Sequence, residues 1–527
     1  MRRFKKVAEI VKSEFQSAFF SLWYLKTDQR EILKTYKIEA LMESSGVKFG
    51  TSGARGLAVQ MTDAVCYAYT VAFLQHLERN GSIHPGCDLA IAGDLRPSTP
   101  RICAAVAKAA ENKGYTPLFC AYIPSPAVAY YGLVNKIPSV MVTGSHIPDD
   151  RNGIKYNTPF GEIMKSDEEG IRAQAVELPD GLFDEKGFFR NPQTLPEPSN
   201  TAEELFIKRY TDFFPADLLS GLRLGVYEHS CVGRDVLKRI YLELGAEVSG
   251  LGRSESFIPV DTEAIRPEDV KLAKDWACEG AFDAILSADG DCDRPLIADE
   301  KGHWLRGDVA GILCAQFLGA DAAVTPVSCN TALEACGSFE RVIRTKIGSP
   351  FVITGMKEAS AGASKMVVGY EANGGFLTNS DFVQDGRVLS ALPTRDAVIL
   401  HIALLAFAKE KRCKVSDLVN ALPSRFTASN RLKEFPTARS QEKLGEFNSG
   451  NHEKDSLAVN RTFGHLCGEL VSIDCLDGIR MTFSNGEIIH LRPSGNAPEL
   501  RCYNEADSET RANELNEKCL ELMSGWR

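Results

Sequence analysis

Short apolar runs separated by longer amphipathic stretches recur along most of this chain. Near its beginning, residues 88–92, 116–120 and 137–142 are apolar runs of strand length. Stretches with helical spacing follow the first two runs and open at Pro97 and at about Ser125, as helices commonly do. Strands that alternate with helices in this way predict a parallel sheet with helices on its faces.

The same alternation returns twice further along the chain. In each later round, apolar runs enclose helical stretches, and a polar loop follows the last run. These three rounds indicate a structural repeat. Loops at equivalent strand ends of packed units would meet in one cleft. The later predicted strands are 222–227, 246–251, 282–287, 322–327, 341–344 and 365–369, and the predicted helices include 232–244, 267–279 and an apolar helix ending near 409.

The character of the chain changes after about residue 427. A polar linker with a helix is predicted up to about residue 456, followed by strands at 471–484 and 488–492 and a terminal helix at 508–523. We therefore predict an α/β protein with three consecutive α/β mixed-sheet domains and a C-terminal α+β domain around a central cleft. The length of 527 residues fits three or four domains at roughly 150 residues each. The predicted boundaries are 1–45 for an N-terminal helical extension, then 46–200, 201–310, 311–427 and 428–527.

The N-terminal extension carries apolar residues at helical spacing from Val7 to Leu22, which predicts an amphipathic helix. Such a helix either docks on the protein body or another subunit, or lies on a membrane surface. Lys12, Glu14 and Gln16 interrupt any signal-peptide core, so we predict no targeting segment.

Composition narrows the class of protein. The net charge of -10 argues against a nucleic-acid partner, because such proteins usually present a basic face. Fifteen cysteines occur without Cys-x-x-Cys pairs, which argues against a zinc site and against a secreted disulfide framework. We therefore expect a cytoplasmic protein with no membrane partner that is either a monomer or a homodimer.

The first polar loop, Thr143 to Pro148, follows a predicted buried strand and leads into a predicted loop at 149–153. It sets the hydroxyl of Ser145 beside the imidazole of His146, at the strand end where open α/β sheets bind ligands. Lys155 lies shortly afterwards in the sequence. An ordinary strand-to-loop turn is the alternative, since Ser, Gly and Pro are turn residues.

The second polar loop contains Asp289, Asp291 and Asp293 at alternate positions after a predicted strand, followed by Arg294. Carboxylates at this spacing can converge on one hard cation. Two features argue against an EF-hand: Arg294 stands where that motif needs Gly, and 295–298 is a predicted strand. The alternative is a solvated acidic turn.

Three further segments have residues suited to binding phosphate or sugar groups. Residues 48–56 combine three glycines, two hydroxyls and Arg55, which suits an anion-binding loop. Residues 371–375 offer Glu and Asn to sugar hydroxyls, and 492–501 offer two arginines, a Ser and an Asn to an anion. Each segment can equally be an ordinary exposed turn.

Taken together and in this order, the motifs resemble the α-D-phosphohexomutase superfamily, over about residues 46–507. Within it, the chain is most similar to bacterial phosphomannomutases and phosphoglucomutases. The resemblance implies that Ser145 carries the phosphoryl group, that Mg²⁺ is bound by Asp289, Asp291, Asp293 and Ser145, and that the other site residues divide into three groups. These are His146, Lys155, Arg55 and Arg294 at the reaction centre, Glu371 and Asn373 at the sugar, and Arg492, Ser494, Gly495, Asn496 and Arg501 at the non-reacting phosphate.

The implied activity interconverts hexose 6-phosphate and hexose 1-phosphate through a phosphoserine and a hexose 1,6-bisphosphate. Mannose is the first choice of sugar and glucose the second. A phosphatase with an aspartate nucleophile and a non-catalytic sugar-phosphate sensor are the alternatives. The chain departs from the family motifs at Ile147, at Tyr370, Asn373 and Gly375, and at 496–497, and these departures leave the identity of the sugar open.

Overall fold

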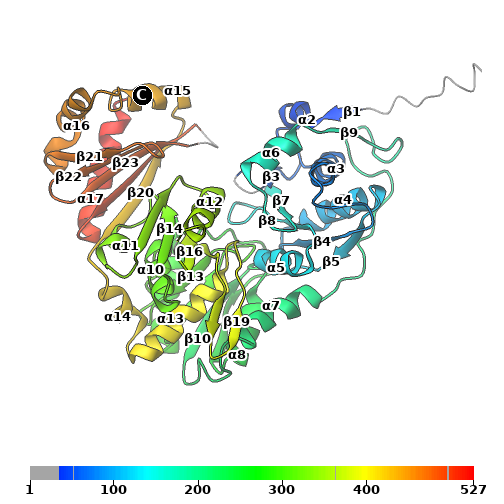
Figure 1. Ribbon diagram of the computed structural model, residues 1–527, viewed down its shortest axis with the longest axis horizontal. Helices are drawn as coiled ribbons and strands as arrows, with labels where there is room; N and C mark the ends of the chain where they lie inside the picture. Colours follow the sequence, from blue (N-terminus) through cyan, green and yellow to red (C-terminus); the bar gives the residue numbers. More distant parts are fainter. Residues whose placement is uncertain (1–34, 51–52, 363, 495–497) are drawn as a thin grey trace, which may run out of the picture.

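The computed structural model describes residues 35–50, 53–362, 364–494 and 498–527. The helix predicted between Val7 and Leu22 lies outside these residues. Four larger sheets follow one another along the chain, and we call each sheet with the helices packed on it a unit, numbered in chain order. The first unit lies to the right in Figure 1, the second and third lie below, and the fourth lies at the upper left.

The first unit has a seven-stranded sheet. Its centre is β5-β4-β6-β7, in which β4, β5 and β6 are parallel and β7 is antiparallel to β6. Helices α3, α4 and α5 pack on this unit. The bounds are β2 Lys48–Phe49, β3 Gly53–Leu57, α3 Asp63–Arg79, β4 Asp88–Gly93, α4 Thr99–Asn112, β5 Thr116–Phe119, α5 Ser125–Asn135, β6 Ser139–Val142, β7 Arg151–Thr158 and β8 Gly161–Glu162.

Two segments that were predicted as loops are strands in this sheet. Strand β7 begins at Arg151, inside the predicted loop at 149–153, and 48–56 contains β2 and β3. Gly53 and Gly153 serve close pairing rather than turning: a Cβ on Gly53 would lie 2.0 Å from the Ile154 carbonyl oxygen, and one on Gly153 would lie 2.8 Å from that of Ala54. The predictions were wrong because a glycine that permits close backbone approach looks the same in sequence as a turn glycine.

The second and third units repeat the central order of the first. Their sheets are β11-β10-β12-β13 and β15-β14-β16-β17, each with three parallel strands and an antiparallel fourth. The predicted repeat is therefore present. The bounds are β10 Arg223–His229, α8 Arg234–Glu243, β11 Glu247–Arg253, α9 Pro267–Gly280, β12 Ala284–Ala288, β13 Pro295–Ala298, α10 Gly307–Phe317, β14 Ala322–Pro326, α11 Ala332–Ala335, β15 Arg341–Thr345, α12 Ser349–Ser360, β16 Val367–Tyr370, β17 Phe376–Thr378, α13 Ala397–Lys411 and α14 Val415–Asn420.

The fourth unit is a five-stranded antiparallel sheet, β20-β24-β23-β22-β21, with helices. The run predicted as one strand at 471–484 is a hairpin, and the predicted linker at 428–456 contains part of β20 and two helices. Strand β20 is a mostly exposed edge strand, so it has no apolar run to reveal it. The bounds are β20 Phe426–Leu432, α15 Thr437–Gly445, α16 His452–Cys467, β21 Leu470–Asp474, β22 Ile479–Phe483, β23 Ile488–Pro493, β24 Leu500–Ala506 and α17 Glu509–Ser524.

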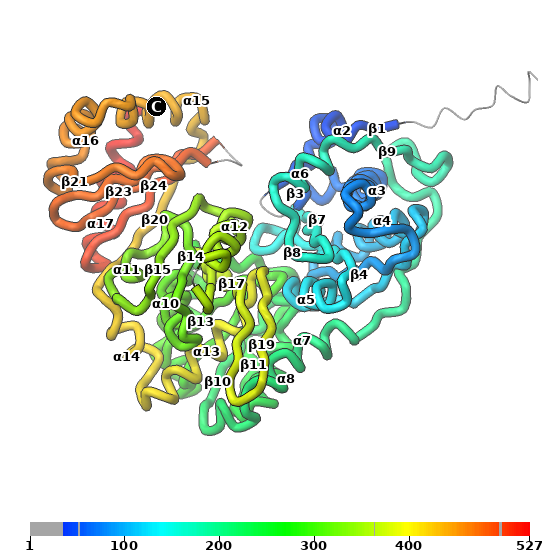
Figure 2. The backbone as a smooth tube through the Cα atoms, viewed as in Figure 1, coloured from blue at the N-terminus to red at the C-terminus, as the bar shows by residue number. Residues whose placement is uncertain are grey.

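Smaller elements complete the described chain, and in Figure 2 the backbone runs along the left edge from α14 into β20. No helix of the described residues is both long and apolar enough to cross a membrane. All fifteen cysteines are free thiols. The remaining bounds are β1 Thr35–Lys37, α2 Ile38–Ser45, α6 Lys165–Arg172, β9 Ala175–Glu177, α7 Thr201–Thr211, β18 Phe382–Gln384 and β19 Arg387–Leu389.

Buried apolar packing joins the first three units, which also have smaller clusters of their own, but does not include the fourth. One cluster of buried side chains runs without interruption through the first three units, from Met141 through Leu224 to Val368. The fourth unit has its own cluster, which includes Phe463 and Leu491. Buried apolar packing therefore holds the first three units together, whereas the fourth has a separate core.

Candidate active site

Three predicted site loops occupy the same place in three successive units. Each lies between the last parallel strand and the antiparallel strand: Ser145 between β6 and β7, Asp289 to Asp293 between β12 and β13, and Glu371 between β16 and β17. The repeat therefore explains why residues so far apart in sequence are brought together.

Ser145 is completely buried, and its backbone has a φ of 58°, in the left-handed region. The Thr143 hydroxyl accepts a hydrogen bond from the Ser145 amide at 2.7 Å and stabilises this turn. The Ser145 hydroxyl donates to Asp289 Oδ2 at 2.6 Å. The first loop and the second loop are thus in direct contact through the predicted nucleophile.

Arg96 supports the serine loop and was not among the predicted site residues. Its buried guanidinium donates to the backbone oxygens of Ser145 at 2.7 Å and Ile147 at 2.6 Å. It also pairs with Asp94 at 3.0 Å and stacks on Phe257, 4.0 Å from the ring centre. No local sequence signal marks Arg96, because most of its partners are backbone atoms about fifty residues away.

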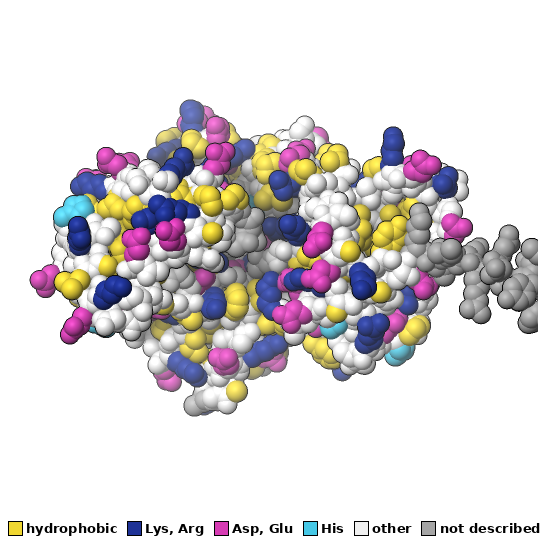
Figure 3. Space-filling view, turned by 90° about the horizontal axis from the view of Figure 1, so that it is seen from above, with side chains coloured by type: hydrophobic (Ala, Val, Ile, Leu, Met, Phe, Trp, Pro, Cys, Tyr) yellow, Lys and Arg dark blue, Asp and Glu magenta, His cyan; other side chains and the backbone are white. Residues whose placement is uncertain are grey.

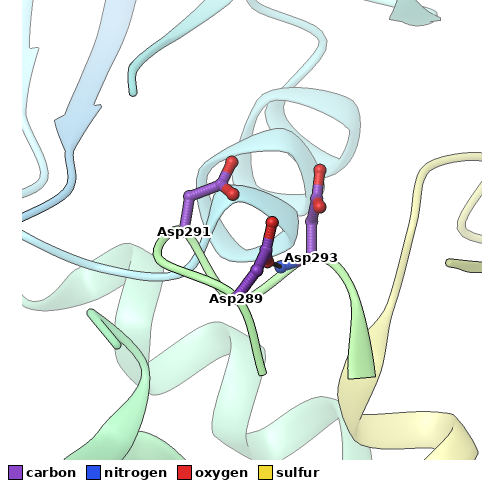
Figure 4. A group of neighbouring side chains, drawn as sticks. All are labelled: Asp289, Asp291 and Asp293. Atoms are coloured by element: carbon purple, nitrogen blue, oxygen red, sulfur yellow. Dashed lines mark hydrogen bonds between the residues drawn. The ribbon is translucent and has the colours of Figure 1, made fainter. Parts of the chain in front are cut away.

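The three aspartates form a cluster of buried carboxylates that can hold a metal ion. One oxygen from each lies within 4.8 Å of the others. Figure 4 shows the three side chains rising from one loop toward the same side. Oδ1 of Asp291 and Oδ1 of Asp293 are buried and have no hydrogen-bond partner within the described part of the chain. Buried carboxylate oxygens without partners are costly unless a cation binds them, so the cluster fits a divalent metal.

Cationic side chains surround this cluster. Lys155 Nζ lies 2.6 Å from Asp291 Oδ2 and 2.6 Å from Asp293 Oδ2. Burial would lower the pKa of Lys155, but the two aspartates raise it above its usual value, so the ammonium stays charged. Burial and the nearby Arg294 lower the pKa of Arg55 to about 10, which still leaves its guanidinium charged at neutral pH.

Their surroundings shift the pKa values of Asp289 and Asp293 in opposite directions. Burial and the charges of Asp291 and Asp293 raise the pKa of Asp289 well above its usual value. Burial also favours a protonated Asp293, but Lys155 and Arg395 outweigh it and lower the pKa of that carboxyl. Nearby positive charge is therefore needed to keep these carboxyls ionised, and a bound cation would supply more of it.

His146 acts as an acceptor in this structure. Arg294 Nη1 lies 2.7 Å from His146 Nδ1, and because a guanidinium can only donate, Nδ1 must accept. Burial and the charge of Arg294 lower the pKa of His146 to about 3. The imidazole is therefore neutral, and Ser145 Oγ lies 3.2 Å from the same nitrogen.

The third loop joins the site through Arg395, a second residue missed in the sequence. Arg395 Nε donates to Glu371 Oε2 at 2.6 Å, and Nη1 lies 3.5 Å from Asp293 Oδ2. Asn373 turns its side chain inward onto the Gly375 amide at 2.9 Å. The Asn373 carbonyl accepts from the Thr262 hydroxyl at 2.7 Å, which ties the loop to the second unit.

The predicted phosphate-binding residues lie on the fourth unit. Arg492 and Arg501 are register partners on β23 and β24, and Ser494 is buried next to them. Gly495 and Asn496 lie outside the described residues. Among the described residues, no hydrogen bond or ion pair links Arg492 or Arg501 to Ser145 or the aspartates. Figure 3, seen from above, shows a hollow between the fourth and first units with lysine and arginine side chains beside it.

A serine held against a buried aspartate cluster, at equivalent loops of a repeated α/β fold, defines a class of phosphoryl-transferring enzyme. Sequence models of the phosphoglucomutase/phosphomannomutase family match three parts of the chain: alpha/beta/alpha domain I at residues 46–179, alpha/beta/alpha domain III at 306–426 and the C-terminal domain at 410–522. The chain therefore belongs to the phosphoglucomutase/phosphomannomutase family and is a hexose-phosphate mutase.

Individual relatives agree with this assignment. The chain is 43% identical to a phosphomannomutase of Salmonella muenchen over 92% of its own length and 96% of the relative's. It is 42% identical to one from Sinorhizobium fredii over 89% and 97% of the two chains. Its fold is similar to a phosphoglucomutase/phosphomannomutase family protein from Burkholderia thailandensis, with a TM-score of 0.68 at 17% identity over 90% and 96% of the chains.

Proposed function

We propose that this protein is a phosphomannomutase that interconverts mannose 6-phosphate and mannose 1-phosphate through a phosphoserine at position 145. The 2.6 Å contact between the Ser145 hydroxyl and Asp289 carries this proposal, because it places a nucleophile at a metal-type cluster. The similar proteins of Salmonella muenchen and Sinorhizobium fredii are both named phosphomannomutase. Glucose phosphates are the second candidate substrates, because the matching family also contains phosphoglucomutases.

The metal in this proposal is Mg²⁺, held by Asp289, Asp291 and Asp293 together with an oxygen on Ser145. Carboxylate and phosphate oxygens are the ligands that Mg²⁺ prefers. When bound, the ion would offset the negative charge of the transferring phosphoryl group.

The protein's own residues would align and neutralise the reacting groups. Arg96 fixes the loop that presents the Ser145 hydroxyl, so the nucleophile needs no reordering at the moment of attack. Lys155 and Arg294 supply fixed positive charge beside the phosphoryl oxygens. His146 is neutral and its Nδ1 accepts from Arg294, so it would hold that guanidinium in place.

The other loops would bind the part of the substrate that does not react. Glu371, held by Arg395, would accept hydrogen bonds from sugar hydroxyls. Arg492 and Arg501 would bind the second phosphate. Phosphoserine would donate its phosphoryl group to the hexose phosphate and form mannose 1,6-bisphosphate. That bisphosphate would turn round in the cleft and return its other phosphate to Ser145.

The test combines mass spectrometry with kinetics. Incubation with mannose 1,6-bisphosphate should add one phosphoryl group to the wild-type protein and none to Ser145→Ala, which should also lose mutase activity. Ser139→Ala removes a buried hydroxyl from β6, the strand that leads into the Ser145 loop, and should keep both properties. Catalytic efficiency should be higher with mannose 1-phosphate than with glucose 1-phosphate. Undiminished turnover in Ser145→Ala would instead indicate an aspartate nucleophile and overturn the proposal.

A further inference from the structure

Asp477 lies in the turn of the β21–β22 hairpin and joins two units through one carboxylate oxygen. Oδ2 accepts a hydrogen bond from Arg492 Nε at 2.8 Å and from the Ile347 backbone amide at 2.9 Å. Arg492 belongs to the fourth unit, whereas Ile347 lies in the third unit between β15 and α12. One acceptor therefore connects a predicted phosphate-binding arginine to a neighbouring unit with a separate core.

The turn that carries Asp477 is itself held against β23. His490 Nε2 lies 2.6 Å from the Asp477 carbonyl oxygen. Gly478 follows with a φ of 85°, and a Cβ there would lie 2.3 Å from the Leu491 carbonyl oxygen. The turn thus packs directly on β23, the strand that carries Arg492. These contacts fix the backbone of Asp477 and so limit where its carboxylate can lie.

The atom that Asp477 engages on Arg492 matters. A guanidinium has five N–H donors in one plane, and phosphate is usually bound through two of them side by side. A carboxylate bonded at Nε fixes the plane and leaves the terminal Nη groups for a ligand. Both side chains are 17% exposed, so solvent reaches the pair but does not surround it.

We propose that Asp477 is a positioning residue for the mutase reaction, which orients Arg492 toward the non-reacting phosphate and ties that arginine to the third unit. This inference rests on the proposed function, in which Arg492 binds phosphate. Asp477 and Arg492 both belong to the fourth unit, so the carboxylate keeps the plane of the guanidinium fixed even when that unit moves. A bisphosphate that turns round in the cleft is then held at one end by an arginine of fixed orientation.

The experiment measures steady-state kinetics of Asp477→Ala and Asp477→Asn. We expect the KM for mannose 1-phosphate to rise about tenfold in Asp477→Ala, since a misplaced arginine loses about one charge-assisted bond to phosphate. The concentration of mannose 1,6-bisphosphate needed for half-maximal activity should rise in parallel, because a loosely held intermediate escapes before it turns. The kcat at saturation should change less than KM. Asp477→Asn keeps one acceptor oxygen, so its KM should lie between those of the wild type and Asp477→Ala.

A double-mutant cycle separates positioning from structural damage. If Asp477 acts through Arg492, then Asp477→Ala should add no further rise in KM to Arg492→Ala. Asp507→Asn, an exposed carboxylate of the same unit, is the matched control and should leave KM unchanged. Should Asp477→Ala fail to fold, Asp477→Asn carries the same comparison.

Two outcomes would overturn the inference: an unchanged KM in both Asp477 variants, or effects of Asp477→Ala and Arg492→Ala that simply add. Failure of the proposed function gives a different result. An Arg492→Ala protein with an unchanged KM would remove the phosphate-binding role itself, whereas a raised KM there with none at Asp477 would reject only the positioning role.

Discussion

Arg96 holds the loop that carries Ser145, the proposed nucleophile, and would not itself take part in the reaction. We expect Arg96→Lys to lower kcat on the order of a hundredfold, because an error of about 1 Å in a reacting group has that effect. Lysine has three N–H donors at one point and cannot replace the guanidinium's bonds to the carbonyls of Ser145, Ile147 and Pro148 together with its bond to Asp94. Each buried carbonyl left unsatisfied costs roughly 1–3 kcal/mol. Turnover and the free energy of unfolding in urea check both expectations.

Arg101 offers a matched control for this substitution. It lies in the same unit and also donates to backbone carbonyls, those of Met61 and Ala58, but it does not contact the serine loop. Arg101→Lys should reduce stability and leave kcat near the wild-type value. Full activity in Arg96→Lys would show that the loop keeps its conformation without the guanidinium.

The residues that could be predicted from the sequence are those whose chemistry is visible within a short segment. Ser145 is next to His146, and the three aspartates occupy alternate positions, so each motif can be recognised within a few residues of sequence. Arg395 looked like a helix-capping residue because its partners, Glu371 and Asp293, are distant in sequence. The roles of all these residues stay predictions until they are tested.

At the scale of elements, periodicity predicted the parallel strands well, whereas among the antiparallel strands it predicted β13 and β23 but missed others. The parallel strands β4, β12 and β14 are buried along their length, so continuous apolar runs reveal them. Strand β7 is interrupted in sequence by polar residues and by Gly153, which a loop would also contain. Strands β20 and β24 were missed because they are stabilised by pairing with neighbouring strands, and their own sequences carry no clear strand pattern.

Helix α13 carries a buried histidine that should make the fold sensitive to acid. His401 is surrounded by apolar residues, and Tyr241 Oη lies 2.7 Å from its Nδ1. Burial lowers the pKa of His401 to about 3, from 6.5 in the unfolded chain. A lowered folded-state pKa gives stability that is complete above pH 6.5 and is lost as the pH falls below it, because the unfolded chain then binds the extra proton.

We therefore expect His401 to contribute about 1.4 kcal/mol of lost stability between pH 7.5 and 5.5. Urea titrations measure this loss. Between pH 7.5 and 5.5, the free energy of unfolding of a protein with both His401→Leu and Tyr241→Phe should fall by about 1.4 kcal/mol less than that of the wild type. His452→Leu, which replaces an exposed histidine, is the matched control for the loss of one imidazole. Equal losses in the double variant and the wild type would contradict the prediction.

At the scale of the whole molecule, the fourth unit is attached to the third through polar contacts. Arg425, just before β20, donates to Glu505 of β24 at 2.6 Å, and Glu505 also accepts from Thr331 of the third unit. Asn330 Nδ2 donates to the Arg425 carbonyl at 2.6 Å. Polar contacts can be replaced by hydrogen bonds to water, which costs less free energy than exposing a shared apolar core. The fourth unit is therefore expected to move relative to the third at this boundary.

A substrate with phosphate at both ends should close the fourth unit onto the first three. The Ser145→Ala protein is suited to this measurement, because it should bind mannose 1,6-bisphosphate without turning it over. We expect the radius of gyration from small-angle X-ray scattering to fall when the bisphosphate is added, since Arg492 and Arg501 must approach the metal cluster to share one ligand with it. Mannose without phosphate cannot bridge the two sides and should leave the scattering unchanged. An unaltered curve at saturation, with binding established by calorimetry, would show that the cleft is already closed around its substrate.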